Sequence, residues 1–213
     1  APLTVTDIET GEMVKYVDNV WHAFKVAFGN EVGNVCKALD IDSHKVMDIF
    51  VQDTKLNISP YYLKPGFAFG GSCLPKDVRA FTYLAKTLDV EFPLIGNLIR
   101  SNKQQIDRAE QMVLETGAKT VGVLGFSFKA GTDDLRESPV VELIERLRGK
   151  GKWLKIYDRN VNLAKLVGAN RDYLLNTIPH ISTMMTDDLA GLVDEVDVII
   201  IGNSDPAFDG IYE

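Results

Sequence analysis

One apolar stretch decides the fold: Lys119-Thr120-Val121-Gly122-Val123-Leu124-Gly125, a short strand-like run that ends at a glycine. Here the period of the apolar residues changes from helical to strand-like. The following elements are predicted to be a helix at 138–149 with Pro139 in its first turn, a strand at 154–158, helices at 160–168 and 187–193, and a buried strand at 196–202. Strands that alternate with helices at this spacing predict a Rossmann-like, doubly wound parallel sheet.

The turn after the first strand reads Gly125-Phe126-Ser127-Phe128-Lys129-Ala130-Gly131, which is not the GxGxxG pattern of a standard NAD cradle. Asp158 ends the second strand, where dinucleotide folds carry an acidic residue, so the strand ends could hold another nucleotide. Lys129 and Arg136 flank the polar cluster that follows, and two cations there suit a phosphate or phosphosugar. Alternatively, this polar cluster could simply be a solvated loop.

The chain before this stretch is predicted to be helical, apart from one long loop. The expected helices run over about 7–38 with the capping-box pair Thr6 and Glu9, over 43–52 with Ser43 as cap, over 75–88, and from Pro93 to Gly117. The middle of the last one, residues 100–105, is polar all round, which is typical of a helix that bridges domains. We therefore expect an all-helical central domain at 1–117 and a truncated sheet domain at 118–213.

The first helix carries two different faces at about 100° per residue. Its broad apolar face is formed by Val17, Val20, Trp21, Phe24, Phe28, Val32 and Val35. Its opposite face carries Lys15, Asn19, His22, Val26 and Asn30. Asparagine is a poor helix former, so this second stripe suggests donors that face a ligand, although a chance polar face is the alternative. A lysine and an asparagine four residues apart can jointly stabilise an oxyanion.

Residues 57–71 cannot form regular structure, because prolines and glycines interrupt them. The loop is rich in aromatic residues and leads directly into Cys73, which suggests a substrate-binding segment. The alternative is that these aromatic side chains pack on the core.

The segment Gly70-Gly71-Ser72-Cys73-Leu74-Pro75-Lys76-Asp77 is the strongest chemical signal in the chain. The glycines allow close approach of the backbone, and Pro75 favours the first turn of a helix. Cys73 is therefore expected at a helix N-terminus with a cation, Lys76, nearby, which are the conditions for a nucleophilic thiolate. Asp77, four residues on, supplies a neighbouring base. An isolated cysteine would more often be a buried small hydrophobe.

Composition excludes several classes of protein. A net charge of −7 argues against sequence-independent binding of nucleic acid. The two cysteines, Cys36 and Cys73, have no metal-ligand spacing, so we expect neither zinc nor a disulfide framework, and a reducing, cytoplasmic setting. No apolar run approaches the ~18 residues of a membrane helix. The chain begins without Met and stops after a strand-like run, and we expect it to be a piece of a longer chain.

These motifs together resemble the UDP-glucose/GDP-mannose 6-dehydrogenase family. The resemblance rests on Lys15-x-x-x-Asn19, on Asn30-Glu31, on the segment from Gly70 to Asp77, and on Gly125-x-x-Phe128-Lys129-x-x-Thr132-Asp133-Asp134-x-Arg136-Glu137-Ser138. It covers essentially the whole chain, with the motifs in the expected order. Tyr61-Tyr62-x-Lys64-Pro65-Gly66-Phe67 and His22 are most similar to the family members that oxidise GDP-mannose to GDP-mannuronate for alginate-type exopolysaccharides.

The resemblance implies a four-electron oxidation of a sugar alcohol that consumes two NAD through a thioester on Cys73. It implies that Lys15 and Asn19 hold the oxyanion and that Asp77 deprotonates or positions water. Lys76 and Arg136 would contact NAD, whose main binding domain would precede this chain. The implied substrate-binding residues are Lys15, Asn19, His22, Asn30, Tyr61, Tyr62, Lys64, Phe67 and Lys129. The helical domain would support a homodimer or higher homo-oligomer.

Other interpretations stay open. The best-known GDP-mannose enzymes carry Arg where this chain has Lys64, and a planar fork is not equivalent to a point charge. A UDP-sugar 6-dehydrogenase, acting on UDP-glucose or a UDP-N-acetyl-hexosamine, is therefore an alternative. A two-electron hydroxyacid dehydrogenase would share the Lys-x-x-x-Asn pair but would not need Cys73. A dimerisation or nucleotide-binding module without chemistry is the non-enzymatic alternative.

Overall fold

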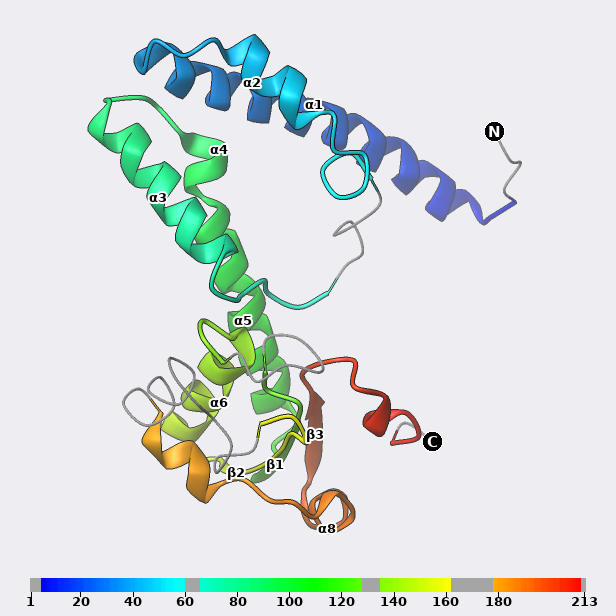
Figure 1. The fold of residues 1–213 in the computed structure, drawn as a ribbon. Coiled ribbons are helices and arrows are strands. Elements are labelled where there is room, and N and C mark those ends of the chain that lie inside the picture. The colour runs from blue at the N-terminus through cyan, green and yellow to red at the C-terminus, as the bar shows by residue number, and fades with distance from the viewer. Residues whose placement is uncertain (1–4, 60–65, 128–134, 162–177, 212–213) are drawn as a thin grey trace. The chain divides into compact units, whose positions relative to one another are not determined.

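The computed structural model describes residues 5–59, 66–127, 135–161 and 178–211, without the side chains of residues 16–20, 22, 23, 26 and 27 (Figure 1). The chain forms two compact units, each built from two segments. We call Ala1–Pro65 with Val78–Leu98 the helical unit, and Gly66–Asp77 with Ile99–Glu213 the sheet unit. The segment that carries Cys73 therefore belongs to the sheet unit, although helical sequence surrounds it.

The helical unit contains α1 (Ile8–Ala38), α2 (Ser43–Phe50), most of α3 (Leu74–Thr87) and α4 (Pro93–Gly96). The predicted helices at 7–38, 43–52 and 75–88 are confirmed to within two residues. The core of this unit is formed by Val32, Val35, Cys36, Ala85, Phe92 and Ile95. The apolar face of α1 is only partly buried: Phe24 and Phe28 are half-buried, whereas Trp21 is exposed and stacks on Phe24.

Both predicted helix caps are wrong by one residue. Asp7, not Thr6, caps α1, because its carboxylate accepts from the backbone N–H of Thr10 at 2.7 Å. The hydrogen bonds from the backbone and the hydroxyl of Thr10 lower the pKa of Asp7. Asp42, not Ser43, caps α2 and accepts from two backbone N–H groups. In both cases a carboxylate, which is the stronger acceptor, stands next to the hydroxyl that the pattern favours.

The helix predicted from Pro93 to Gly117 is two helices. α4 ends at Gly96 and α5 runs over Leu98–Glu115, with Asn97 between them. The Asn97 side chain donates to the carbonyl of Pro93, so it satisfies an acceptor that a continuous helix would pair through the backbone. Gly117 has the left-handed φ of +72°, as expected of a C′ glycine that ends α5.

The sheet unit contains a small parallel sheet in the order β2-β1-β3 among the residues that the structure describes. The elements are β1 (Thr120–Leu124), α6 (Pro139–Gly149), β2 (Trp153–Tyr157), the 3-10 helix η1 (Pro179–Thr183), α8 (Leu189–Glu195), β3 (Val198–Ile201) and the 3-10 helix η2 (Pro206–Phe208). This order confirms a Rossmann-like arrangement that follows a helical region. The helix predicted at 160–168 lies almost wholly outside the described residues.

Helices cover both faces of the sheet, as a doubly wound fold requires. Val121 and Val123 pack with side chains of α5 and α6 on one face. Leu124 packs with Leu192 of α8 and Phe208 of η2 on the other. β3 was predicted to be buried, but its residues are only half-buried, and among the described residues it lies at the edge of the sheet, paired with β1. No helix among the described residues has the length and apolarity to cross a membrane.

Candidate functional site

Cys73 is the residue directly before α3, as the proline signal predicts. Its carbonyl accepts from the backbone N–H of Asp77 at 3.0 Å, which closes the first turn. The thiol is exposed, in contrast to the buried thiol of Cys36. Ser72 Oγ lies 3.9 Å from the Cys73 sulfur. A thiol in this position can attack an electrophile that reaches the surface of the sheet unit.

The two charged residues of the segment lie beside each other in the first turn of α3. Lys76 Nζ is 3.5 Å from Asp77 Oδ1, and both side chains are largely exposed. Such an exposed pair contributes little to stability, so both groups are available to a ligand. The Asp77 carboxylate can accept a proton or orient a water molecule, and the Lys76 ammonium can bind an anion.

The glycines hold the segment against the loop that precedes α6. Gly70 and Gly71 are buried, and a Cβ atom at residue 70 would overlap the carbonyl oxygen of Glu137 and lie 2.6 Å from Pro139 Cδ. Gly71 has a left-handed φ of +82°, which turns the chain toward Cys73. The double glycine therefore serves close approach and chain reversal, as its sequence suggests.

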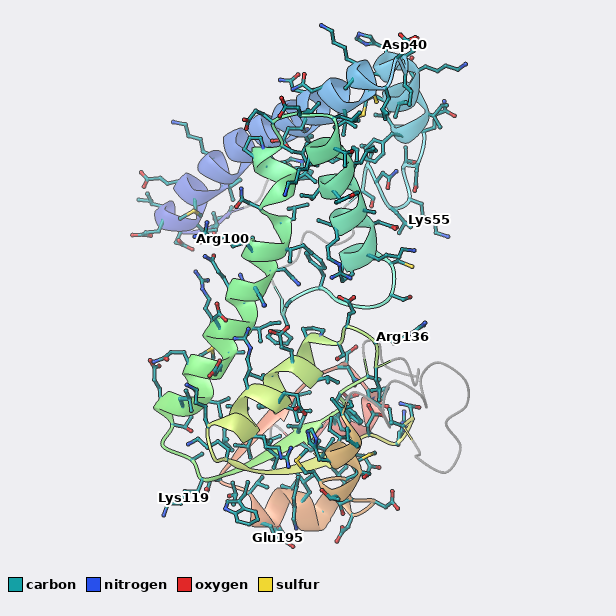
Figure 2. The ribbon with its side chains drawn as sticks, turned by 90° about the vertical axis from the view of Figure 1, so that its left-hand side faces the viewer. Asp40, Lys55, Arg100, Lys119, Arg136 and Glu195 are labelled. Atoms are coloured by element: carbon teal, nitrogen blue, oxygen red, sulfur yellow. The ribbon has the colours of Figure 1, made fainter. Side chains whose placement is uncertain are left out.

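Arg136 comes close to the Cys73 segment through this packing. It precedes Glu137, which has an unusual φ of +51°, in the loop between β1 and α6, where Figure 2 labels it. The carbonyl of Glu137 contacts Gly70, so Lys76 and Arg136 belong to two packed segments of one unit. Two cations on adjoining segments are suited to a diphosphate group.

The carboxyl end of the sheet is organised by Asp158. One oxygen of its buried carboxylate accepts from the backbone N–H groups of Phe126 and Ser127, and the other accepts from that of Asn160. The acidic residue at the end of β2 thus holds the turn after β1 through these bonds. The hydrogen bonds from Phe126, Ser127 and Asn160 therefore explain why an acidic residue stands at the end of β2.

A second carboxylate network at this end was missed by the sequence analysis. Buried Asp205 accepts from Arg159 at 2.7 and 2.8 Å, from Asn160 at 3.1 Å and from the backbone N–H of Ala207 at 2.8 Å. Burial raises the pKa of Asp205, but the hydrogen bonds from Ala207, Asn160 and Arg159 outweigh it and leave the pKa lowered. No local motif reveals the bonds from Arg159 and Asn160, because these residues lie 46 and 45 positions before Asp205.

The predicted polar stripe of α1 is described only in part. Lys15 and Asn30 are exposed, whereas the side chains of Asn19 and His22 lie outside the described residues. Asn30 lines a hollow of about 840 Å³ between α1 and α2, with Lys37 and His44 also on its wall. Side chains of Asn30, Lys37 and His44 thus line a surface hollow of the helical unit.

Glu31 is the buried neighbour of Asn30 and has a structural role that its sequence context did not reveal. Its carboxylate accepts from the backbone N–H groups of Leu94 and Ile95 at 2.5 and 2.9 Å, at the start of α4. A carboxylate at a helix N-terminus satisfies donors that have no partner within the helix. Glu31 thus fixes which face of α1 turns inward and leaves Asn30 outside.

Most of the remaining residues that were predicted to bind substrate lie outside the described part of the chain. Tyr61, Tyr62, Lys64 and Lys129 lie outside the described residues, and Phe67 is 41% exposed at the start of the Cys73 segment. Phe67, Cys73, Lys76, Asp77 and Arg136 all belong to the sheet unit. Lys15, Asn19, His22 and Asn30 belong to the helical unit.

Comparison with known proteins identifies the class. Residues 9–104 match the model of the UDP-glucose/GDP-mannose dehydrogenase family, central domain, and residues 122–213 match that family's UDP binding domain. The chain belongs to the UDP-glucose/GDP-mannose dehydrogenase family. The resemblance inferred from the motifs is thereby confirmed.

Particular members of the family are similar over most of the chain. The GDP-mannose 6-dehydrogenase of Pseudomonas aeruginosa is 54% identical over 98% of this chain and 48% of its own length. The crystal structure of a ternary complex of GDP-mannose dehydrogenase from that organism covers 95% of this chain and 47% of its own, with a TM-score of 0.91 and 55% identity. The UDP-glucose 6-dehydrogenase TuaD of Bacillus subtilis is 36% identical over 74% of this chain and 35% of its own length. The chain thus spans about half the length of the GDP-mannose enzyme.

Proposed function

We propose that the chain is part of an NAD-dependent, four-electron nucleotide-sugar 6-dehydrogenase that oxidises GDP-mannose to GDP-mannuronate. The observation that carries the chemistry is the exposed Cys73 thiol directly before α3, beside Lys76 and Asp77. The similarity to GDP-mannose 6-dehydrogenases over nearly the whole chain supports the choice of sugar nucleotide.

NAD supplies the hydride acceptor in this reaction, and two molecules of it are needed for one sugar. Lys76 and Arg136, on segments that pack together through Gly70, would hold negative groups of this cofactor. Most of the NAD site would lie in residues that precede this chain in a longer protein. We therefore expect the 213-residue chain alone not to turn over, and NADH formation by it would contradict that expectation.

Cys73 provides the covalent step. After the primary alcohol has lost its first hydride, the Cys73 sulfur adds to the aldehyde carbon, and the carbonyl electrons move to oxygen. Loss of a second hydride from the same carbon gives a thioester on Cys73. Water then adds to the thioester, the carbon–sulfur bond breaks, and the sulfur leaves as thiolate while the sugar keeps the carboxylate.

Other residues stabilise and orient these species. Asp77 would deprotonate or position the attacking water, since it follows Cys73 by one turn. Lys15 and Asn19 would hold the oxyanion, an assignment that follows the family resemblance. His22, Asn30, Tyr61, Tyr62, Lys64, Phe67 and Lys129 would bind the nucleotide sugar, some of them across a homodimer.

The test counts NADH formed per GDP-mannose consumed by the longer protein that contains these residues, with NAD in excess. We expect the unaltered protein to form two NADH per sugar. We expect the Cys73→Ala variant to lose this activity. One NADH, or activity indifferent to Cys73, would favour a two-electron dehydrogenase. Turnover with UDP-glucose or a UDP-N-acetyl-hexosamine but not GDP-mannose would keep the chemistry and change the substrate. No binding or turnover of either would favour a non-catalytic module.

A further inference from the structure

Asn102, in the polar stretch of α5, binds the backbone of the Cys73 segment. The Phe69 N–H donates to Asn102 Oδ1 at 2.8 Å, and Asn102 Nδ2 donates to the Phe69 carbonyl at 2.8 Å. One side-chain amide thus pairs with both polar groups of one residue, as a neighbouring strand would. The two residues are 33 positions apart and both lie in the sheet unit.

This pair is the first of three successive constraints on the segment. Phe69 is bound by Asn102, Gly70 is packed against Glu137, and Gly71 takes a left-handed turn. Just before them Ala68 packs on the core of the sheet unit. The backbone is therefore fixed at consecutive residues, whereas the flanking side chains of Phe67 and Cys73 are exposed.

We propose that Asn102 is a positioning residue that sets the place of the Cys73 thiol by holding the backbone of Phe69. Asn102 does not act on the substrate itself. Its effect on turnover rests on the proposed function, in which Cys73 must reach the aldehyde carbon. Displacing a reacting group by about 1 Å can cost on the order of 100-fold in rate.

The proposal also accounts for an asparagine inside a helix, where this residue is unfavourable. Asn102 is half-buried, whereas its helical neighbours Ser101, Lys103 and Gln104 are exposed. Its amide supplies a donor and an acceptor side by side, the pair that a peptide group needs. An aspartate at this position would keep the acceptor but place a second oxygen against the Phe69 carbonyl.

The experiment compares Asn102→Ala and Asn102→Asp with Gln104→Ala, which removes an exposed amide from the same helix. Hydrogen exchange is measured on the 213-residue chain, and single-turnover NADH formation on the longer protein. Both Asn102 variants are expected to speed exchange in residues 66–73 at least tenfold and to leave the strands unchanged. Gln104→Ala is expected to change neither region.

In single turnover, the first NADH per sugar is expected at the normal rate and the second at least tenfold more slowly, because only the second needs the thiol. KM for NAD is expected to stay within twofold. A role confined to folding would instead slow both NADH equally or speed exchange throughout the chain, and either result would overturn the proposal. Unchanged exchange in residues 66–73 would overturn it too.

The two proposals can fail separately. If the unaltered longer protein forms no NADH with any nucleotide sugar, the proposed function fails, and the exchange experiment still decides whether Asn102 holds the segment. If the unaltered protein forms two NADH per sugar and the Asn102 variants do the same at normal rates, only the positioning role is lost.

Discussion

Gly70 lies against the carbonyl oxygen of Glu137 so closely that a Cβ atom on Gly70 would overlap that oxygen. The contact joins the segment that carries the exposed thiol to the loop that carries Arg136. Both partners are backbone atoms, so neither can rotate away as a flexible side chain would. We expect this contact to tolerate no larger residue.

Gly70→Ala is therefore predicted to destabilise the sheet unit by about 1–3 kcal/mol, the usual cost of overpacking. The matched control is Gly66→Ala, because Gly66 is exposed and an added Cβ there would contact nothing within 4 Å. We expect the control to change the free energy of unfolding by no more than about 0.5 kcal/mol. Urea denaturation measures both, and equal effects would argue against a special contact at Gly70.

The two thiols are predicted to react very differently with iodoacetamide. Cys73 is exposed and Cys36 is buried in the core of the helical unit. Native protein should therefore take up one label per chain rapidly, and Cys73→Ala should abolish this fast label. In denaturant two labels per chain are expected, and mass spectrometry of the peptides assigns them. Fast labelling of Cys36 in the native chain would contradict the burial of that residue.

Glu31→Gln is predicted to lower the free energy of unfolding by about 1.5–3 kcal/mol, the range for a hydrogen bond to a charged group. The cause is loss of the carboxylate that accepts from Leu94 and Ile95. Glu12→Gln, an exposed glutamate of the same helix, serves as the control. Hydrogen exchange at the start of α4 should rise only in the Glu31 variant, and protection kept there would disprove the cap.

Asp205→Asn is predicted to lower the melting temperature at pH 7 and to have a progressively smaller effect as the pH falls below about 4. The pKa of Asp205 is lowered in the folded chain, so its ionised form stabilises the fold above the unfolded pKa of about 3.9. That contribution is lost as the pH falls through the folded pKa, and the two proteins then converge. Thermal denaturation over this pH range provides the test, and a constant difference would contradict it.

The regular elements could be predicted from the sequence because their signals are local. Apolar spacing indicates α1 and the alternation of strands with helices, and Pro139 and Gly117 mark a start and an end. The caps failed because Thr6 and Asp7 are both good acceptors, and the pattern does not decide which one reaches Thr10. The break at Asn97 was missed although Gly96 precedes it, because an isolated glycine within a helical pattern does not by itself decide that a helix ends there.

The sequence predicts which residues belong to the candidate site but not the contacts that hold them in place. Cys73, Lys76 and Asp77 lie within five consecutive residues, so a local sequence motif places them near one another. Asn102 with Phe69, Glu31 with Leu94, and Asp205 with Arg159 are each joined by long-range folding, and no spacing rule links them. Sequence showed which groups could do chemistry, but not which distant groups hold them.

The assignment of residues 66–77 to the sheet unit has a consequence for recombination between homologues. A crossover placed at residue 118 would follow the boundary between the helical and strand-like sequence. Such a chimera would inherit Asn102 and the thiol from one parent and Glu137, against which Gly70 packs, from the other. Exchange of residues 66–77 together with 99–213 would take all of these partners from one parent. Chimeras designed on spatial contacts should therefore be functional more often than chimeras with a single crossover at residue 118.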